Sequence, residues 1–139
     1  MADNYTEAFA RYGARLTNRG WSLSAFTPHG DLVVSVWHTE LDFDKDARTI
    51  TYEDVLSRWL GNAGGRAELR SHLTQLKRDG GRLRLVIAHP KTEADRALVG
   101  KVQNEAIIPK TFEVRPQLIG TLEEFDGDYL KYVFREGHG

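Results

Sequence analysis

The chain of 139 residues contains no cysteine, and none of its apolar runs approaches the roughly 20 residues that span a bilayer as a helix. Without cysteine there is no disulfide framework and no thiolate zinc site. The first residues, Met1 to Glu7, lack the basic start and the apolar centre of a signal peptide. We therefore expect a cytoplasmic protein with no membrane association.

An excess of charge of one sign is also missing, because 19 Lys and Arg residues face 20 Asp and Glu residues. Overall charge therefore does not indicate a nucleic-acid-binding protein. The distribution is uneven: acids outnumber bases over residues 40–54, and bases outnumber acids over residues 66–84. A local basic face binds phosphate even on a neutral chain, because salt screening keeps the interaction local. The phosphate-binding candidates are Arg66, Arg70, Arg82 and Arg84. The alternative is a pair of solvated helix faces.

Strong catalytic motifs are absent as well. No serine lies in a Gly-x-Ser-x-Gly elbow, and the glycine-rich stretch 61–66 lacks the lysine and hydroxyl residue of a P-loop. The acids of Glu40–Asp44, close after His38, would share one side of a strand, but no second set of metal ligands follows. The apolar stretch 83–88 has no lysine where a PD-(D/E)xK-type nuclease requires it. We predict no catalytic residues, metal or cofactor, and binding is favoured over catalysis.

The apolar share of 40% and charged share of 28% are typical of a globular protein, and we expect one domain over residues 1–139. Hydrophobic periodicity, glycines and capping residues predict the elements. The first half of the chain is predicted to form a helix over 5–18, a hairpin over 21–37, a helix over 51–60 capped by Thr51 and Asp54, and a helix over 66–78. A central strand over 83–88 follows, and then a helix capped by Thr92 and Asp95 with Leu98, Val99 and Val102 inward. The chain ends with strands over 111–114 and 118–134, with a turn at Asp126-Gly127.

This order, α-β-β-α-α-β-α-β-β, predicts an α+β fold. We expect a mixed, mainly antiparallel sheet of about five strands, covered by three to four helices.

Four aromatic residues stand out, on the predicted hairpin and the helix that follows it: Trp21, Trp37, Tyr52 and Trp59. Aromatic faces stack on planar ligands, nucleobases above all, but large aromatic side chains also fill cores. Trp59 lies in a helical stripe with Leu56 and Leu60, which indicates a core position. Trp37 and Tyr52 lie at the ends of predicted elements, where both roles stay open.

The stretch Leu32–Trp37, an acidic loop, Tyr52, two helices and an apolar strand together resemble the N-terminal reader domains of McrA-type HNH restriction endonucleases. The resemblance covers residues 15–90. In that family the tryptophan after the strand and the tyrosine entering the helix matter for recognising modified cytosine, and Trp37 and Tyr52 match them. The loop between the two is longer here. The HNH nuclease half is absent, since the chain has no Cys-x-x-Cys and no His-His pair.

The resemblance implies a reader domain without nuclease activity, or part of a longer enzyme that carries a nuclease domain. Our leading hypothesis is a DNA-binding domain that senses modified bases of the 5-methylcytosine type in duplex DNA, in restriction-modification and defence against phage. The base-binding candidates are Trp37, Tyr52, Trp21 and His38. One alternative is a small-molecule- or metal-binding α+β domain or enzyme that uses His38 and the nearby acids. Another is a protein-interaction module, immunity- or inhibitor-like, that acts through the acidic segment 40–54.

Overall fold

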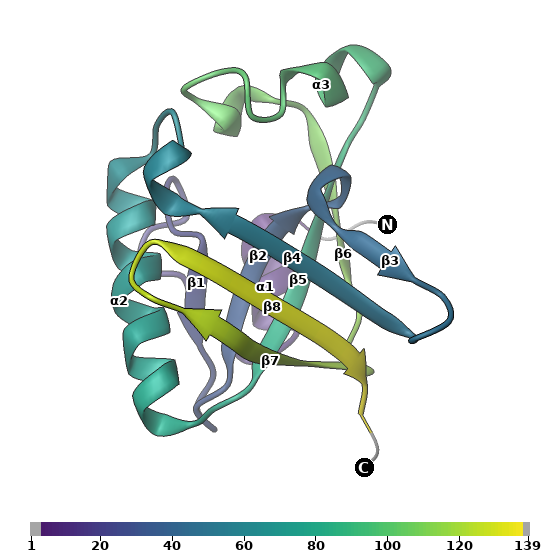
Figure 1. Cartoon of the computed structure of the whole chain (residues 1–139). Coiled ribbons are helices and arrows are strands. Elements are labelled where there is room, and N and C mark those ends of the chain that lie inside the picture. Colours follow the sequence, from purple (N-terminus) through teal and green to yellow (C-terminus); the bar gives the residue numbers. More distant parts are fainter. Residues whose placement is uncertain (1–3, 138–139) are drawn as a thin grey trace.

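A strongly twisted sheet of eight strands organises residues 4–137, the part of the chain that this computed structural model describes (Figure 1). The strand order is β1-β2-β5-β7-β8-β4-β3, and β6 lies beside β5. The elements are α1 (Tyr5–Ala10), β1 (Ser24–Phe26), β2 (Leu32–Trp37), η1 (His38–Glu40), β3 (Asp42–Asp44), β4 (Thr49–Val55), η2 (Leu56–Arg58), α2 (Ala63–Asp79), β5 (Leu83–Pro90), α3 (Glu93–Leu98), η3 (Glu105–Ile107), β6 (Lys110–Val114), β7 (Leu118–Phe125) and β8 (Tyr129–Glu136), where η marks a 3-10 helix.

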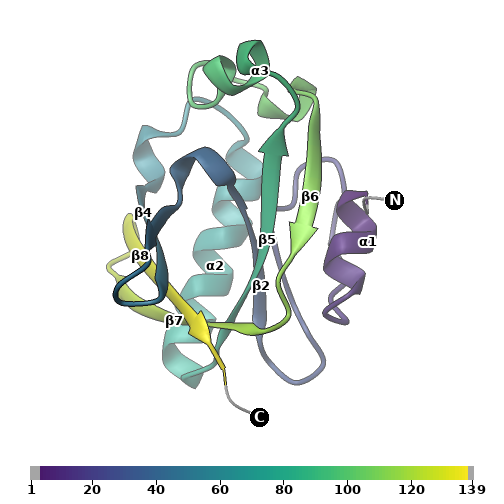
Figure 2. The same ribbon diagram turned by 90° about the vertical axis from the view of Figure 1, so that its right-hand side faces the viewer.

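The sheet folds over on itself at β5. β2 and β5 are parallel, and all other pairings are antiparallel. β6 pairs with β5 over residues 86–90, whereas β7 pairs with β5 only where Gly120 faces Leu83. Gly120 is required at this crossing, because a Cβ there would lie 2.5 Å from the ring of Phe134. Consequently β7, β8 and β4 lie across from β2 and β5, and α2 closes one side (Figures 1 and 2).

Two cores hold the layers together. The larger lies between the two halves of the sheet and α2, whose Leu69, Leu73 and Leu76 share one helical face and are buried. The smaller lies on the opposite face of β2 and β5, where Phe9 of α1 is fully buried with Val33 and other apolar residues. Adjacent residues of β2 enter different cores because side chains alternate along a strand.

The first helix is shorter than predicted. It begins with a capping box between Asn4 and Glu7 and ends at Ala10, not near residue 18. Gly13 has a φ of 82°, which breaks the helical path, and the Tyr12 hydroxyl donates to the carbonyl of Leu85 at 2.7 Å. The aromatic spacing therefore continues beyond the helix.

The helix predicted over 51–60 is wrong. The chain forms strand β4, in which Ile50 and Tyr52 are buried, and then the short η2. The spacing of Tyr52, Val55 and Leu56 is helical, but the β-branched and aromatic residues that begin the segment favour an extended chain, and pairing with β8 secures it. The preceding segment, expected to be a loop, contains η1 and β3.

The α+β class is confirmed, with eight strands instead of about five. The central strand near 83–88, the helix near 66–78 and the hairpin turn at Asp126-Gly127 are also confirmed. Thr92 and Asp95 form the predicted capping box of α3, but Leu98 is exposed, not inward. Among the described residues, no helix is both long and apolar enough to cross a membrane.

Candidate functional site

A cavity of about 490 Å³ lies where the parallel strands β2 and β5 end. Ligands in α/β proteins commonly bind beyond the carboxyl ends of parallel strands. Its lining residues come from segments that are distant in the sequence, within 19–23, 35–37, 52–62 and 100–112, together with Glu40. Its aromatic lining consists of Tyr5, Trp21, Trp37, Tyr52, Trp59 and Phe112, and its charged lining of Arg19, Glu40, Asp54, Arg58, Glu105 and Lys110.

All three tryptophans of the chain line this cavity. Trp37 ends β2 and is half-buried, and its Nε1 donates to Oε1 of Glu105 at 3.3 Å. Trp59 follows η2 and is also half-buried, and its Nε1 donates to Oδ2 of Asp54 at 2.8 Å. Trp21 is exposed. Two indole rings thus serve as walls while their N–H groups hold two carboxylates in place.

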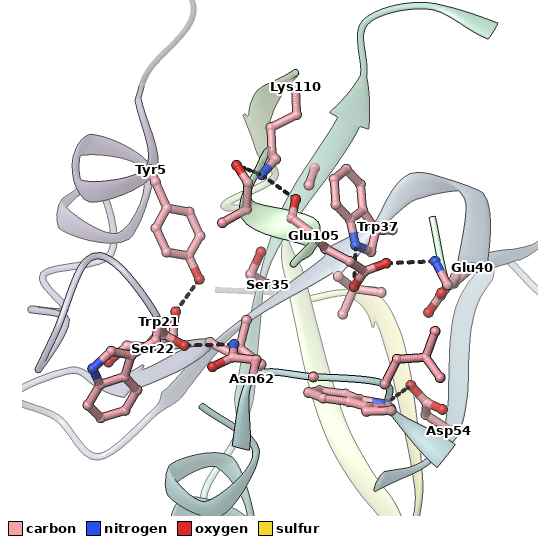
Figure 3. Close-up of a pocket in the computed structure, with 18 of the residues that line it drawn as sticks. Tyr5, Trp21, Ser22, Ser35, Trp37, Glu40, Asp54, Asn62, Glu105 and Lys110 are labelled. Carbon is pink, nitrogen blue, oxygen red and sulfur yellow. Dashed lines mark hydrogen bonds between the residues drawn. The ribbon is translucent and has the colours of Figure 1, made fainter. Parts of the chain in front are cut away.

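Three carboxyl groups from three elements enter the cavity, as Figure 3 shows for Glu40, Asp54 and Glu105. Asp54 accepts hydrogen bonds from the Tyr52 hydroxyl and Trp59, and from its neighbouring backbone at 2.7 Å. Glu105 accepts from Trp37 and from a backbone N–H at 2.7 Å. No group in residues 4–137 hydrogen-bonds the Glu40 carboxyl.

The Glu40 carboxyl is the titratable group of this site. Glu40 lines the cavity, and the residue as a whole is exposed to solvent. Burial of the carboxyl, together with the nearby charges of Asp54 and Glu105, raises the pKa of Glu40 to about 7. The group therefore exchanges its proton near neutral pH.

The three cationic side chains that line the cavity differ in their exposure to solvent. Lys110 is half-buried, and its Nζ donates to the carbonyl of Glu105 at 3.2 Å and lies 5.2 Å from the Trp37 ring centre. Burial lowers the pKa of Lys110, and the charge of Glu105 opposes this shift. Arg19 and Arg58 line the cavity but are exposed. The carboxylates of Asp54 and Glu105 are thus less exposed than these two guanidinium groups.

The glycine-rich stretch after Trp59 joins the walls together. A Cβ on Gly61 would lie 2.1 Å from the carbonyl oxygen of Gln103, so only glycine allows this approach. Asn62, with a φ of 57°, donates from Nδ2 to the carbonyl of Trp21 at 3.0 Å and caps α2. A Cβ on Gly65 would lie 2.3 Å from the same carbonyl. Gly61 and Gly65 therefore allow neighbouring walls of the cavity to pack closely against each other.

The turn between β7 and β8 anchors the wall that carries Trp59. Asp128 accepts hydrogen bonds from the backbone N–H and the hydroxyl of Ser57, both at 2.8 Å. Its carbonyl accepts from the backbone of Leu56 at 2.9 Å. These contacts fix η2, and therefore the residues that follow it, against the sheet.

The predicted base-binding residues divide into two groups. Trp37, Tyr52 and Trp21 line the cavity, although Tyr52 is 5% exposed and lies in the middle of β4, not at the start of a helix. His38 lies outside the cavity lining and stacks on His89 at 4.6 Å. Burial, followed by the charge of His89, lowers the pKa of His38. Trp59, predicted as core, packs on the core and also lines the cavity.

The four predicted phosphate-binding arginines do not line the cavity, and they contact the protein itself. Arg66 donates to the carbonyl of Trp59 at 3.0 Å, and Arg70 to that of Gly127 at 2.7 Å. At the start of β5, Arg82 and Arg84 pair with Asp31 at 3.3 and 3.6 Å. Their contact with phosphate stays a prediction.

Sequence reasoning missed the lining residues Arg19, Arg58, Glu105 and Lys110. No motif marks them. The pairing of β6 with β5 brings Lys110 to the site, and Gly61 packs on Gln103 in the segment that contains Glu105. Within residues 4–137, no three His, Asp or Glu side chains form a metal-binding group. Comparisons with protein-family models, curated proteins and solved structures give no match.

Proposed function

We propose that this chain is a DNA-binding domain that senses modified bases, and that its cavity takes up a base of the 5-methylcytosine type. The observation that carries the proposal is the cavity lining, which includes every tryptophan of the chain and two carboxylates that are hydrogen-bonded to Trp37 and Trp59. The volume of about 490 Å³ lies within the usual range for ligand pockets, roughly 300–1,000 Å³. Flat aromatic walls with polar groups between them suit a nucleobase.

A base that enters this cavity must leave the double helix. Trp37 and Trp59 are half-buried and Tyr52 is buried, so they do not reach a base that remains stacked. Proteins that act on single bases extrude the nucleotide at a cost of a few kcal/mol and then stack it between aromatic side chains. The cavity supplies such side chains.

The exposed cations suit the DNA backbone. Arg19 and Arg58 line the cavity and keep their guanidinium groups accessible. Phosphate contacts fix the position of a protein on DNA, while groups inside the pocket read the base. In this arrangement Arg19 and Arg58 hold the phosphates that flank the extruded nucleotide.

Both residues that match the McrA-type readers, Trp37 and Tyr52, line the cavity, although Tyr52 lies on strand β4 and does not enter a helix as the resemblance implies. We extend the proposal accordingly to cytoplasmic defence against phage. The chain acts as the sensor in restriction, and a separate domain or protein supplies the nuclease.

A fluorescence-anisotropy titration tests the proposal. The probes are three duplexes that differ at one position: cytosine, 5-methylcytosine or 5-hydroxymethylcytosine, at 50 and 200 mM salt. We expect tighter binding to a modified duplex and weaker binding of all duplexes at the higher salt. Trp37→Ala should remove the preference, and Phe43→Ala, which changes an exposed aromatic residue outside the cavity, should retain it. Equal affinity of the unaltered protein for all three duplexes would contradict the proposal.

A second candidate function is the binding of a small amino or ammonium ligand, and the carboxyl groups favour it. Aromatic rings together with acids attract organic cations. Here Glu40, Asp54 and Glu105 share a cavity with three tryptophans. Binding of free amines in calorimetry, with no affinity for DNA, would select this function over the first.

A further inference from the structure

The carboxyl groups of the cavity differ in how much hydrogen-bonding capacity they have left. An ionised carboxylate offers about four acceptor positions. Asp54 uses three, for the Tyr52 hydroxyl, the Trp59 indole and a backbone N–H. Glu105 uses two, and Glu40 uses none within residues 4–137. The cavity therefore presents fixed acceptors beside one carboxyl group that is free to pair.

We propose, on the basis of the function proposed above, that Glu40 and the fixed carboxylates read the Watson–Crick edge of the extruded base. They select a base that carries an exocyclic amino group beside an unprotonated ring nitrogen, as cytosine and its 5-substituted forms do. They reject thymine, which carries a carbonyl group at the same place.

The hydrogen-bond pattern explains the selection. A protonated Glu40 donates its O–H to N3 of cytosine and accepts one N–H of the 4-amino group. The second N–H of that amino group needs another acceptor, which Asp54 or Glu105 supplies. Carboxylates are suitable partners for this amino group. A protonated Glu40 also pairs with thymine, because it donates its O–H to O4 and accepts the N3–H. The selection therefore comes from the second carboxylate, Asp54 or Glu105, which accepts from the amino group of cytosine but faces O4 of thymine, where both groups are acceptors. The 5-methyl group is the same in thymine and 5-methylcytosine, so it does not distinguish them.

The surroundings of Glu40 keep its proton available near neutral pH. The titratable and charged side chains that line the same cavity are Tyr52 and Asp54 from β4, Arg58 from η2, Glu105 from η3, Lys110 from β6, and Tyr5 and Arg19. Asp54 and Glu105 are the charges that favour protonation of Glu40, in addition to burial. Ionisation of Glu40 removes the donor to N3. The preference for cytosine-type bases should therefore decrease as pH rises through about 7.

The test compares 5-methylcytosine with thymine in otherwise identical duplexes. Each base is placed opposite an abasic site, so that neither has a pairing partner to lose. We measure Kd by anisotropy at pH 6 and pH 8 for the unaltered protein, Glu40→Gln and Glu40→Ala, after thermal melting has shown each variant to be folded. A glutamine supplies an N–H donor and a carbonyl acceptor at both pH values.

The unaltered protein should prefer 5-methylcytosine by about tenfold at pH 6, the size of one good base-edge interaction, and by less at pH 8. Glu40→Gln should retain the preference at both pH values, and Glu40→Ala should lose it. Binding of both duplexes with equal affinity at pH 6 would overturn the inference and leave the proposed base-binding function in place. Loss of the preference in Glu40→Gln would also overturn it. An absence of affinity for any duplex would overturn the proposed function together with the inference.

Discussion

Asp54 holds two aromatic side chains of the cavity wall in position through hydrogen bonds. Its carboxylate binds the Tyr52 hydroxyl and the Trp59 indole, and it lies half-buried on β4. A charged group away from water is stable only when hydrogen bonds replace its hydration. The three bonds to Asp54 provide this replacement and at the same time fix the aromatic walls. Glu40 has no such bonds within residues 4–137, and burial of its carboxyl together with the charges of Asp54 and Glu105 raises its pKa to about 7.

The first prediction concerns stability and pH at Glu40. Its pKa is about 7 in the folded protein against an ordinary value of 4.5, so the folded state retains the proton more strongly. The stabilising contribution of this proton is complete below about pH 4.5 and is lost as pH rises through about 7. We expect Glu40→Gln to raise Tm relative to the unaltered protein at pH 8 by more than at pH 5. Circular-dichroism melts measure this, with Asp42→Asn, an exposed acid on β3, as the control. A difference that does not change with pH would contradict the assignment.

The second prediction separates wall from core. Tyr52 is 5% exposed and belongs to the main core, whereas Trp37 is half-buried at the end of β2. Tyr52→Ala should therefore destabilise the protein by about 3–5 kcal/mol, as large-to-small changes in cores do. Trp37→Ala should cost less and leave a folded protein without a base preference. Urea unfolding of both variants provides the comparison. A larger loss in Trp37→Ala than in Tyr52→Ala would reverse the two roles.

At the scale of elements, β4 shows why one local pattern misled. Helical spacing of Tyr52, Val55 and Leu56 is also compatible with a strand whose alternate residues, Ile50 and Tyr52, are buried. The deciding contact is with β8, about 80 residues later, where Tyr52 faces Tyr132. The residues near β4 in the sequence do not indicate this pairing, because strand formation depends strongly on tertiary context.

Elements with strong local signals were predictable. The apolar run that becomes β5, the leucine face of α2 and the capping box of α3 follow from composition and spacing alone. The tryptophans of the site stood out by type. Glu105 and Lys110 did not, because their role arises only where η3 and β6 meet the end of β2. The sequence therefore indicated the tryptophans of the site and missed four of its six charged residues.

The third prediction uses two glycines that are three residues apart. Gly61→Ala places a methyl group against the backbone of Gln103, which cannot move without displacing the 100–107 segment. We expect a loss of base binding together with lower stability. Gly64→Ala is the matched control, because its methyl group would lie at an ordinary 3.5 Å from the Trp21 ring. It lies in the first turn of α2, where alanine favours the helix. Melting and anisotropy titration measure both effects, and equal behaviour of the two variants would refute the role of this contact.

At the scale of the whole molecule, the fold gathers one site from distant segments. Residues 19–23, 35–40, 52–62 and 100–112 meet only because the sheet folds over at β5 and α2 closes one side. Arg66, Arg70, Arg82 and Arg84 serve this arrangement through contacts with backbone carbonyls and Asp31. The accessible cations beside the cavity are Arg19 and Arg58.

The fourth prediction concerns the salt dependence of DNA binding. If Arg58 contacts a phosphate, Arg58→Ala should weaken binding to modified and unmodified duplexes alike, and should lower the slope of log K against log salt by about one. Arg78→Ala is the control, because Arg78 is an exposed arginine at the far end of α2. Titrations at four salt concentrations give the slopes. A loss confined to the modified duplex would place Arg58 at the base instead of the backbone.

The most direct measurement of the central claim is the intrinsic fluorescence of the protein. All three tryptophans line the cavity, so their emission reports its occupancy. The protein is titrated with matched duplexes that contain cytosine or 5-methylcytosine, while anisotropy of a labelled DNA end records binding in the same sample. We expect a base stacked in the cavity to change the emission strongly for the 5-methylcytosine duplex and much less for the unmodified one. Binding of the modified duplex with unchanged tryptophan emission would contradict the account.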